Sequence, residues 1–195
     1  MQKQLVRTAL LKLRRHLSQE RCFAASLAIQ TRFLQAPEYL HSKTVALYSP
    51  IQNEVQTELV MHRALEDGKV PVYPRVGSEG LEFVALEHPG ALTPGSFGVL
   101  EPAFGRGVSR EEIDVFVIPG VAFDVRGVRL GYGKGYYDRV LGGYCQGPLI
   151  GFCYEFQLLD RLPAEVHDCR MNRIITENRT LTSGSPSENG ALHER

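Results

Sequence analysis

Residues Val115–Leu141 combine an apolar run, a glycine-rich basic loop and a short helical segment in one continuous stretch. The apolar run VFVIP predicts a buried strand. The glycines at 131, 133 and 135 predict a loop whose backbone N–H groups can approach an anion, and the helix that follows adds partial positive charge there. Arg129 and Lys134 supply full positive charges beside these groups. The order strand, loop, helix therefore predicts a phosphate-binding site in an α/β fold.

Strand and helix patterns alternate along most of the rest of the chain. Strands are expected at Thr44–Tyr48, Val70–Val76, Leu81–Leu86, 114–119, 148–154 and Arg173–Glu177, and a helix at Thr57–Asp67. Residues 88–107 are rich in Gly and Pro and are expected to form a long irregular connection over the surface. The alternation favours a layered α/β sheet.

Two helices are predicted before the first strand. Apolar residues recur at helical spacing from Lys3 to Leu17. Ser18 is a candidate N-cap for a second helix that runs to Gln35, and Pro37 lies where this helix should already have ended. Three basic residues project together beside the apolar face of the first helix, namely Lys3, Arg7 and Arg14. Such a group is most often a solvated helix face.

Length and composition indicate one cytoplasmic domain. A chain of 195 residues can bury one core, so we expect a single domain over residues 1–180 and a disordered tail over 181–195, where few side chains can be buried. The 22 basic and 22 acidic residues give no overall field that would attract nucleic acid or an anionic membrane. The chain shows no secretory signal pattern, no apolar run of about 18 residues and no C-x-x-C pair among its four cysteines.

The glycine spacing fits neither common nucleotide-binding motif. It does not form G-x-G-x-x-G, and Val128 and Tyr136 prevent a G-x-x-x-x-G-K-S/T alignment over Lys134. A tight turn between the strand and the helix would also explain the glycine spacing, when that spacing is considered by itself. Asp138 either complements the helix macrodipole or holds Mg²⁺, and the neighbouring tyrosines are either core residues or ligand contacts.

Glu54 follows the first predicted strand. Taken by its residue type alone, it is more often a surface residue than a ligand contact. In open α/β sheets, however, ligands lie beyond the carboxyl ends of the strands, where Glu54 is expected.

Four segments together resemble one enzyme family. They are KQLVR at residues 3–7, PIQNEVQT at 50–57, RLGYGKGYYDR at 129–139 and LPAEVHD at 162–168. The chain resembles the 5-formyltetrahydrofolate cyclo-ligases, also called methenyltetrahydrofolate synthetases, from about Lys3 to Glu177. The glycine-rich segment is the motif most specific to that family.

The resemblance implies a Rossmann-like three-layer α/β/α sandwich with an N-terminal helical extension. It implies ATP- and Mg²⁺-dependent conversion of 5-formyltetrahydrofolate to 5,10-methenyltetrahydrofolate through a phosphorylated formyl intermediate. The substrate is a small-molecule folate with or without a polyglutamate tail, and the protein is expected to be a monomer. The implied ATP-binding residues are Lys3, Arg7, Arg129, Leu130, Gly131, Tyr132, Gly133, Lys134, Gly135, Tyr136 and Tyr137. The implied folate-binding residues are Glu54, Gly133, Lys134, Gly135, Tyr136 and Tyr137, the metal ligands Asp138 and Asp168, and the catalytic cations Lys134 and Arg129.

One residue departs from the family pattern. Family members often carry an acidic residue four positions after the one matched by Asp168, and this chain has Asn172 there. An amide is a weaker Mg²⁺ ligand than a carboxylate. This departure keeps open a non-catalytic regulator that binds folate or nucleotide without turnover. A third possibility is another small-molecule enzyme on a related scaffold, such as a CoA transferase or a sugar-phosphate isomerase.

Overall fold

The computed structural model describes residues 2–78, 80–95, 98–142, 147–163 and 169–183. Within these residues, the largest sheet has the strand order β13-β12-β10-β7-β1-β2-β3-β6. The bounds are β1 Thr44–Ala46, β2 Val70–Val76, β3 Leu81–Ala85, β6 Gly107–Val108, β7 Val115–Pro119, β10 Leu149–Phe152, β12 Arg173–Ile175 and β13 Thr180–Thr182. The strands from β12 to β2 are parallel, and β13, β3 and β6 pair in antiparallel fashion at the two edges. The predicted α/β class is confirmed.

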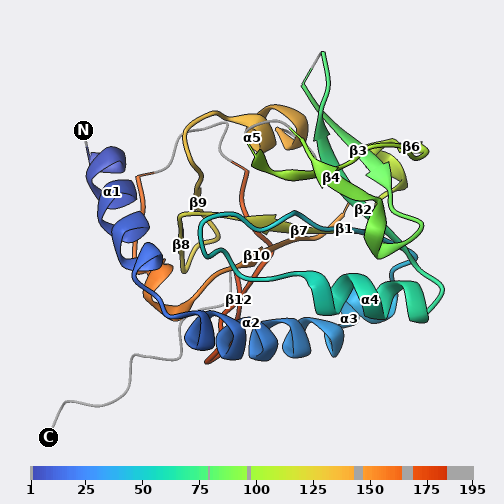
Figure 1. The fold of residues 1–195 in the computed structure, drawn as a ribbon. Coiled ribbons are helices and arrows are strands. Elements are labelled where there is room, and N and C mark those ends of the chain that lie inside the picture. Colours follow the sequence, from blue (N-terminus) through green and yellow to red (C-terminus); the bar gives the residue numbers. More distant parts are fainter. Residues whose placement is uncertain (1, 79, 96–97, 143–146, 164–168, 184–195) are drawn as a thin grey trace, which may run out of the picture.

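Helices lie on both sides of this sheet. Helices α2 (Gln19–Leu34), α3 (Pro37–Leu40) and α4 (Glu58–Glu66) lie along one face, and α5 (Tyr136–Leu141) lies across the opposite face (Figure 1). Helix α1 (Gln2–Arg15) stands at one end of the sheet, beside strand β8. The arrangement agrees with the predicted layers and the predicted N-terminal helical extension. Among the described residues, no helix has both the length and the apolar character needed to cross a membrane.

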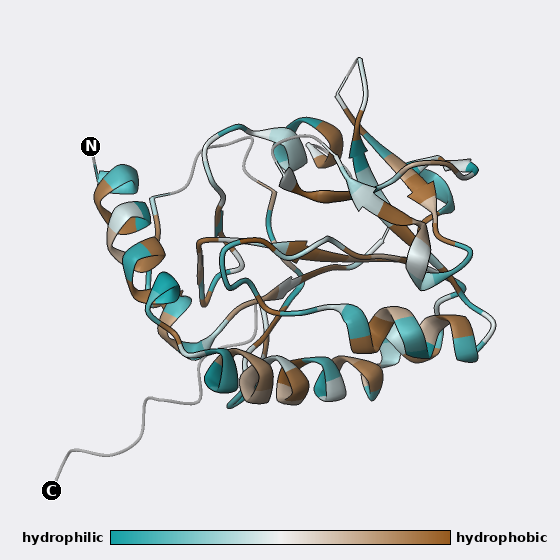
Figure 2. Ribbon diagram, in the orientation of Figure 1, coloured by the Kyte–Doolittle hydropathy of each residue, from teal (hydrophilic) through white to brown (hydrophobic). Residues whose placement is uncertain are grey.

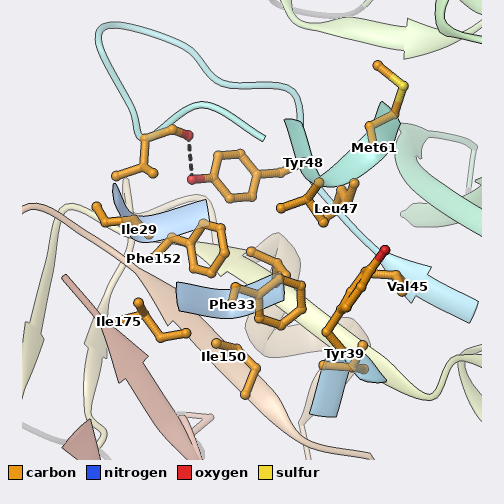
Figure 3. Packing of buried hydrophobic residues seen from close by; sticks show 14 of the residues in the cluster. Ile29, Phe33, Tyr39, Val45, Leu47, Tyr48, Met61, Ile150, Phe152 and Ile175 are labelled. Carbon is orange, nitrogen blue, oxygen red and sulfur yellow. Dashed lines mark hydrogen bonds between the residues drawn. The ribbon is translucent and has the colours of Figure 1, made fainter. Parts of the chain in front are cut away.

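The core on the α2 side is built around aromatic residues. Phe33 of α2 meets Phe152 of β10 edge to face, with ring centroids 5.4 Å apart, and Tyr48 donates a 2.7 Å hydrogen bond to the Val55 carbonyl (Figure 3). The hydrophobic residues of the sheet concentrate in its central strands (Figure 2). Burying each large apolar side chain stabilises the fold by about 1.5–3 kcal/mol.

A second core packs the opposite face and fixes α5. Leu141 at the end of α5 is fully buried and belongs to the same cluster as Phe116 of β7 and Phe83 of β3. The two phenylalanine rings meet edge to face at 5.4 Å. Because α5 follows directly on the glycine-rich loop, this packing also positions the loop.

Several short strands were not predicted. The expectation of an irregular connection over residues 88–107 was wrong, because they contain the antiparallel pair β4 (Leu92–Pro94) and β5 (Leu100–Pro102) and the 3-10 turn η1 (Pro89–Ala91). A small sheet also contains β9 (Arg129–Leu130), which leads directly into the glycine-rich loop. In this sheet β8 (Ala122–Asp124) lies between β9 and β11 (Leu158–Leu159). Strands of two or three residues are too short to show an alternating pattern. The remaining 3-10 turns are η3 (Arg110–Glu112) and η4 (Glu155–Gln157).

The ends of the other elements either agree with the predicted bounds or differ from them slightly. Ser18 caps α2 as predicted, accepting a 3.3 Å hydrogen bond from the Arg21 amide. Pro37 begins α3, because proline is tolerated in the first turn of a helix. Ordered structure continues past residue 180 through β13, and residues 184–195 lie outside the described part. The single domain and the disordered tail remain predictions.

Candidate active site

A cavity of about 820 Å³ lies at the carboxyl ends of the parallel strands. Segments that are distant in the sequence line it. They are Lys3 and Arg7 of α1, Tyr48, Ser49, Ile51, Gln52 and Glu54 after β1, the apolar wall Pro74, Val76, Leu81 and Val99, Glu101 of β5, Pro119 of β7, and residues 129–139. This is the position at which open α/β sheets bind ligands.

Glycines in the loop are required by its geometry. Gly133 and Gly135 have φ angles of 98° and 66°, which favour glycine. A Cβ atom on Gly131 would lie 2.8 Å from Nη1 of Arg129. The Arg7 side chain fixes the loop to α1, because its Nε donates a 2.9 Å hydrogen bond to the Gly131 carbonyl.

Arg129 and Asp138 form an ion pair on the cavity wall. Nη2 of Arg129 donates to Oδ1 of Asp138 at 2.7 Å, and the guanidinium lies 5.5 Å from the Tyr137 ring centroid. Nε of Arg129 is buried and has no hydrogen-bond partner within the described residues. Buried N–H donors in folded proteins nearly always have a hydrogen-bond acceptor, and a bound anion could supply the acceptor for this one.

Glu54 lies at the centre of a buried polar network. Gln52 and Asn53 adopt positive φ angles of 48° and 59° and return the chain toward the cavity. Oε2 of Glu54 then accepts from the Ile51 amide at 3.0 Å, and Oε1 accepts from the Tyr132 hydroxyl at 3.0 Å. Burial raises the pKa of Glu54, and the Arg14 charge and the two hydrogen bonds oppose that shift.

Arg14 was wrongly expected on a solvated helix face. Its side chain is 1% exposed, lies 3.7 Å from the Glu54 carboxylate and donates to the Tyr132 hydroxyl. It also donates to the carbonyls of Gln52 and Gly120 at 3.0 and 3.2 Å. The available signal was its place four residues after the apolar Leu10, which puts Arg14 on the buried side of the helix.

All predicted site residues that the structure describes line the same cavity. They are Lys3, Arg7, Glu54, Arg129, Leu130, Gly131, Tyr132, Gly133, Lys134, Gly135, Tyr136, Tyr137 and Asp138. Asp168, the second predicted metal ligand, lies outside the described residues. Sequence reasoning missed Glu101, which is buried in the same cavity.

Asn172 has a structural role. Its Oδ1 accepts a 2.7 Å hydrogen bond from the Leu149 amide, and its backbone amide donates to the Leu149 carbonyl at 2.8 Å. The side chain thus holds the start of β10 and is not among the residues that line the cavity.

Asp138 is the carboxylate of the glycine-rich segment that could contact Mg²⁺. No group of three or more His, Cys, Asp or Glu side chains suitable for a metal occurs in the described part of the chain. Mg²⁺ in phosphate-binding sites commonly takes one or two protein carboxylates and completes its shell with water and phosphate oxygens. Asp138, which is 29% exposed on the cavity wall, fits that limited role.

Comparison with known proteins gives one consistent family. The model of the 5-formyltetrahydrofolate cyclo-ligase family matches residues 1–177. The 5-formyltetrahydrofolate cyclo-ligase of Mycoplasma pneumoniae is 36% identical over 137 residues, covering 69% of this chain and 73% of that protein. The mouse cyclo-ligase is 29% identical over 180 residues, covering 84% of this chain and 88% of its own.

Solved structures agree with the sequence relatives. The 5,10-methenyltetrahydrofolate synthetase of Aquifex aeolicus superposes with a TM-score of 0.86 at 34% identity, covering 99% of this chain and 98% of that one. The synthetase of Mycoplasma pneumoniae gives a TM-score of 0.75 at 31% identity, with coverage of 91% and 99%. The chain therefore belongs to the 5-formyltetrahydrofolate cyclo-ligase family of ligases.

Proposed function

We propose that this protein uses ATP and Mg²⁺ to cyclise 5-formyltetrahydrofolate to 5,10-methenyltetrahydrofolate, releasing ADP and phosphate, the reaction of EC 6.3.3.2. The observation that carries the proposal is the shared cavity. Cationic side chains from α1 and the glycine-rich loop line it together with an apolar wall and buried carboxylates. Such a cavity suits a nucleotide phosphate beside a flat, partly apolar ring system.

The chemistry requires activation of the formyl oxygen, because that oxygen is a poor leaving group. In the proposed course the formyl oxygen attacks the γ-phosphorus of ATP, the bond to ADP breaks, and an iminium phosphate forms on N5. N10 then attacks the former formyl carbon, loses its proton, and inorganic phosphate leaves with the oxygen. Both steps depend mainly on positioning and on charge neutralisation.

The cations and backbone amides would stabilise the transferring phosphoryl group. Lys134 and Arg129 are the proposed catalytic cations, and Lys3 and Arg7 would hold the remaining phosphate charge. Charged groups fixed in a cavity stabilise a transition state more than they do in water, because they need no reorganisation. The loop glycines allow backbone N–H groups to approach the same oxygens.

Asp138, with Asp168 as the second ligand implied by the family resemblance, would hold Mg²⁺. The ion, when bound, would neutralise phosphate charge. In the structure Asp138 pairs with Arg129. Arg129 and Mg²⁺ would then compete for the Asp138 carboxylate. If Mg²⁺ takes the carboxylate, Arg129 could pair with phosphate oxygens of ATP instead.

A direct assay tests the proposal. Purified protein, Mg²⁺, ATP and 5-formyltetrahydrofolate should produce the absorbance of methenyltetrahydrofolate, and omission of ATP should abolish it. Lys134→Ala and Asp138→Ala should each lower kcat by about 100-fold or more, in the range seen when a preorganised charge is removed. Lys12→Ala removes an exposed lysine of α1 outside the cavity and serves as the matched control.

Two results would contradict the proposal at different levels. No product from the wild-type protein would overturn the reaction. Product formation with near-normal kcat in both Lys134→Ala and Asp138→Ala would leave the reaction in place and overturn the assignment of those residues.

The non-catalytic regulator is less well supported. Its only indication was Asn172, and that side chain binds the Leu149 amide. A cytoplasmic location and a monomeric state remain predictions, and light scattering on the purified protein measures the second.

A further inference from the structure

We propose that Arg14 is a positioning residue, which holds the Glu54 carboxylate charged and in a fixed direction for the folate. Arg14 is not among the residues that line the cavity, so it acts through Glu54 and Tyr132 rather than on the substrate itself. The inference rests on the proposed function, with Glu54 as the folate contact that the family resemblance implies.

The Arg14 guanidinium joins α1 to three other segments of the chain. Its Nε donates to the Gln52 carbonyl at 3.0 Å, its Nη1 to the Gly120 carbonyl at 3.2 Å and its Nη2 to the Tyr132 hydroxyl. These acceptors lie after β1, after β7 and in the glycine-rich loop, respectively. A planar guanidinium directs its N–H groups along fixed lines, so it holds the three segments in one arrangement.

The backbone of α1 is fixed at the same place. The side-chain amide of Asn53 donates to the carbonyls of Arg14 and Leu17 at 3.2 and 3.3 Å. Asn53 directly precedes Glu54 in the chain. The direction from which Arg14 approaches Glu54 is therefore set by bonds to both its backbone and its side chain.

Arg14 balances the charge of Glu54 without occupying the carboxylate. Glu54 is 5% exposed, and Nη1 of Arg14 lies 3.7 Å from its Oε1, close enough for an ion pair and too far for a direct hydrogen bond. A buried carboxylate that loses its cation is strongly unfavourable. An ionised carboxylate has about four acceptor positions, and two of them accept from the Ile51 amide and the Tyr132 hydroxyl. The remaining positions can accept N–H donors of a ligand.

The other titratable groups around Glu54 are tyrosines. They come from the segment after β1, the glycine-rich loop, α5 and the segment after β10, namely Tyr48, Tyr132, Tyr137 and Tyr154. Burial raises the pKa of all four hydroxyls, which therefore stay uncharged at neutral pH. Of these groups Arg14 supplies the positive charge, and its removal should raise the pKa of Glu54 still further above its usual value.

Arg14→Gln removes the charge and keeps a polar side chain. We expect KM for 5-formyltetrahydrofolate to rise about tenfold or more, because removal of one partner of a buried pair disturbs the other, with KM for ATP within about threefold of wild type. Arg21→Gln makes the same change at an exposed position of α2 and should leave both values unchanged. A rise in KM for ATP with an unchanged KM for folate would overturn the inference.

A double-mutant cycle tests whether Arg14 acts through Glu54. Glu54→Gln should raise KM for folate about tenfold or more in the wild-type protein and about threefold or less in Arg14→Gln, where the same contact is already impaired. Factors that simply multiply would place the action of Arg14 elsewhere and overturn the inference. Glu66→Gln, at an exposed position of α4, should leave KM unchanged in both backgrounds.

If Arg14→Gln does not fold, Arg14→Lys takes its place in the cycle. Lysine keeps the positive charge but lacks the planar fork that holds the three acceptors. Glu54→Gln should again have a smaller effect in this background than in wild type, and multiplying factors would again overturn the inference.

The pH profile separates this role from a purely structural one. In wild type, kcat/KM for 5-formyltetrahydrofolate should fall on the acid side as Glu54 takes up a proton, and in Arg14→Gln this fall should begin at a higher pH. Arg14→Lys keeps the charge and should retain the wild-type position. A fall at the same pH in Arg14→Gln as in wild type would overturn the inference, while wild-type turnover leaves the proposed function standing. No turnover in wild type would overturn the proposed function and this inference with it.

Discussion

Glu54 and Glu101 are buried carboxylates of the same cavity with very different partners. The pKa of Glu54 lies above its usual value of 4.5 because burial penalises its charged form more than Arg14, Ile51 and Tyr132 favour it. The folded protein therefore holds the Glu54 proton more tightly than the unfolded chain does. The stability that this residue contributes is present in full below pH 4.5 and is lost as the pH rises through the raised pKa.

This linkage predicts the pH dependence of a Glu54→Gln variant. The free energy of unfolding of the variant, minus that of wild type, should increase as the pH rises from 4.5 into the neutral range, because only wild type loses stability over that range. Urea unfolding at a series of pH values measures the difference. Glu66→Gln, at an exposed site, should show no such trend, and a Glu54→Gln difference that falls with pH would contradict the assigned direction.

Residue types in the glycine-rich loop could be predicted from the sequence, but the partners of the buried charged residues could not. Lys134, Arg129 and Asp138 lie within ten residues of one another, so their proximity is local. Arg14 and Glu101 acquire their environments from segments more than 20 residues away, including Tyr132 for Arg14 and Val76 for Glu101. Their chemistry depends on tertiary contacts that a local pattern does not contain.

At the scale of elements, the cavity depends on contact between α1 and the glycine-rich loop. Arg7 and Gly131 are separated by 124 positions, yet the Arg7 Nε donates to the Gly131 carbonyl at 2.9 Å. Helix α1 also packs on the small sheet through Leu10, which clusters with Val121 and Leu130. These contacts hold one cationic helix face over the loop.

Charge reversal on α1 tests the phosphate role of that face. Arg7→Glu should raise KM for ATP about tenfold or more, because it replaces a cation near phosphate by an anion and removes the hydrogen bond to the loop. Thr8→Glu adds the same side chain at an exposed neighbouring position and should leave KM for ATP near the wild-type value. The two variants are compared by steady-state kinetics at saturating folate. An unchanged KM for ATP in Arg7→Glu would contradict the phosphate role and would favour Arg7 as part of a solvated helix face.

Elements with a clear period were predicted well and very short ones were not. The helices α1, α2 and α4 and the strand β2 agree with their patterns to within a few residues. The pairs β4–β5 and β8–β9 are fixed by contacts between strands, and too few residues alternate in each for a pattern to appear. Glu101 lies in one of these pairs, so the element and the residue were missed for the same reason.

At the scale of the whole molecule, alternation of strands and helices predicted the class but not the strand order. β7 lies between β1 and β10, although the strands from β2 to β6 separate β1 from β7 in the sequence. That order places the carboxyl end of β7 beside the end of β1, so that Pro119 of β7 and Glu54 from the segment after β1 line one cavity. Such an arrangement follows from packing across the sheet, which residue patterns along the chain do not specify.

Two truncations locate the C-terminal boundary of the fold. Strand β13 pairs with β12, and Ser183 donates from its backbone amide to the Asn172 carbonyl at 3.0 Å. A chain that ends at Arg179 loses these bonds, each worth about 0.5–1.5 kcal/mol, and its Tm should fall by about 5 °C or more. A chain that ends at Ser183 keeps them and should retain the wild-type Tm and kcat, as expected for a disordered tail. Calorimetry measures the Tm of the two truncated chains, and the methenyltetrahydrofolate assay measures their kcat.

Asn172 also binds the Leu149 amide at the start of β10. A large fall in Tm confined to the shorter chain would therefore mean that β13 supports the sheet from its edge. A similar loss in the longer chain would show that residues 184–195 belong to the folded domain.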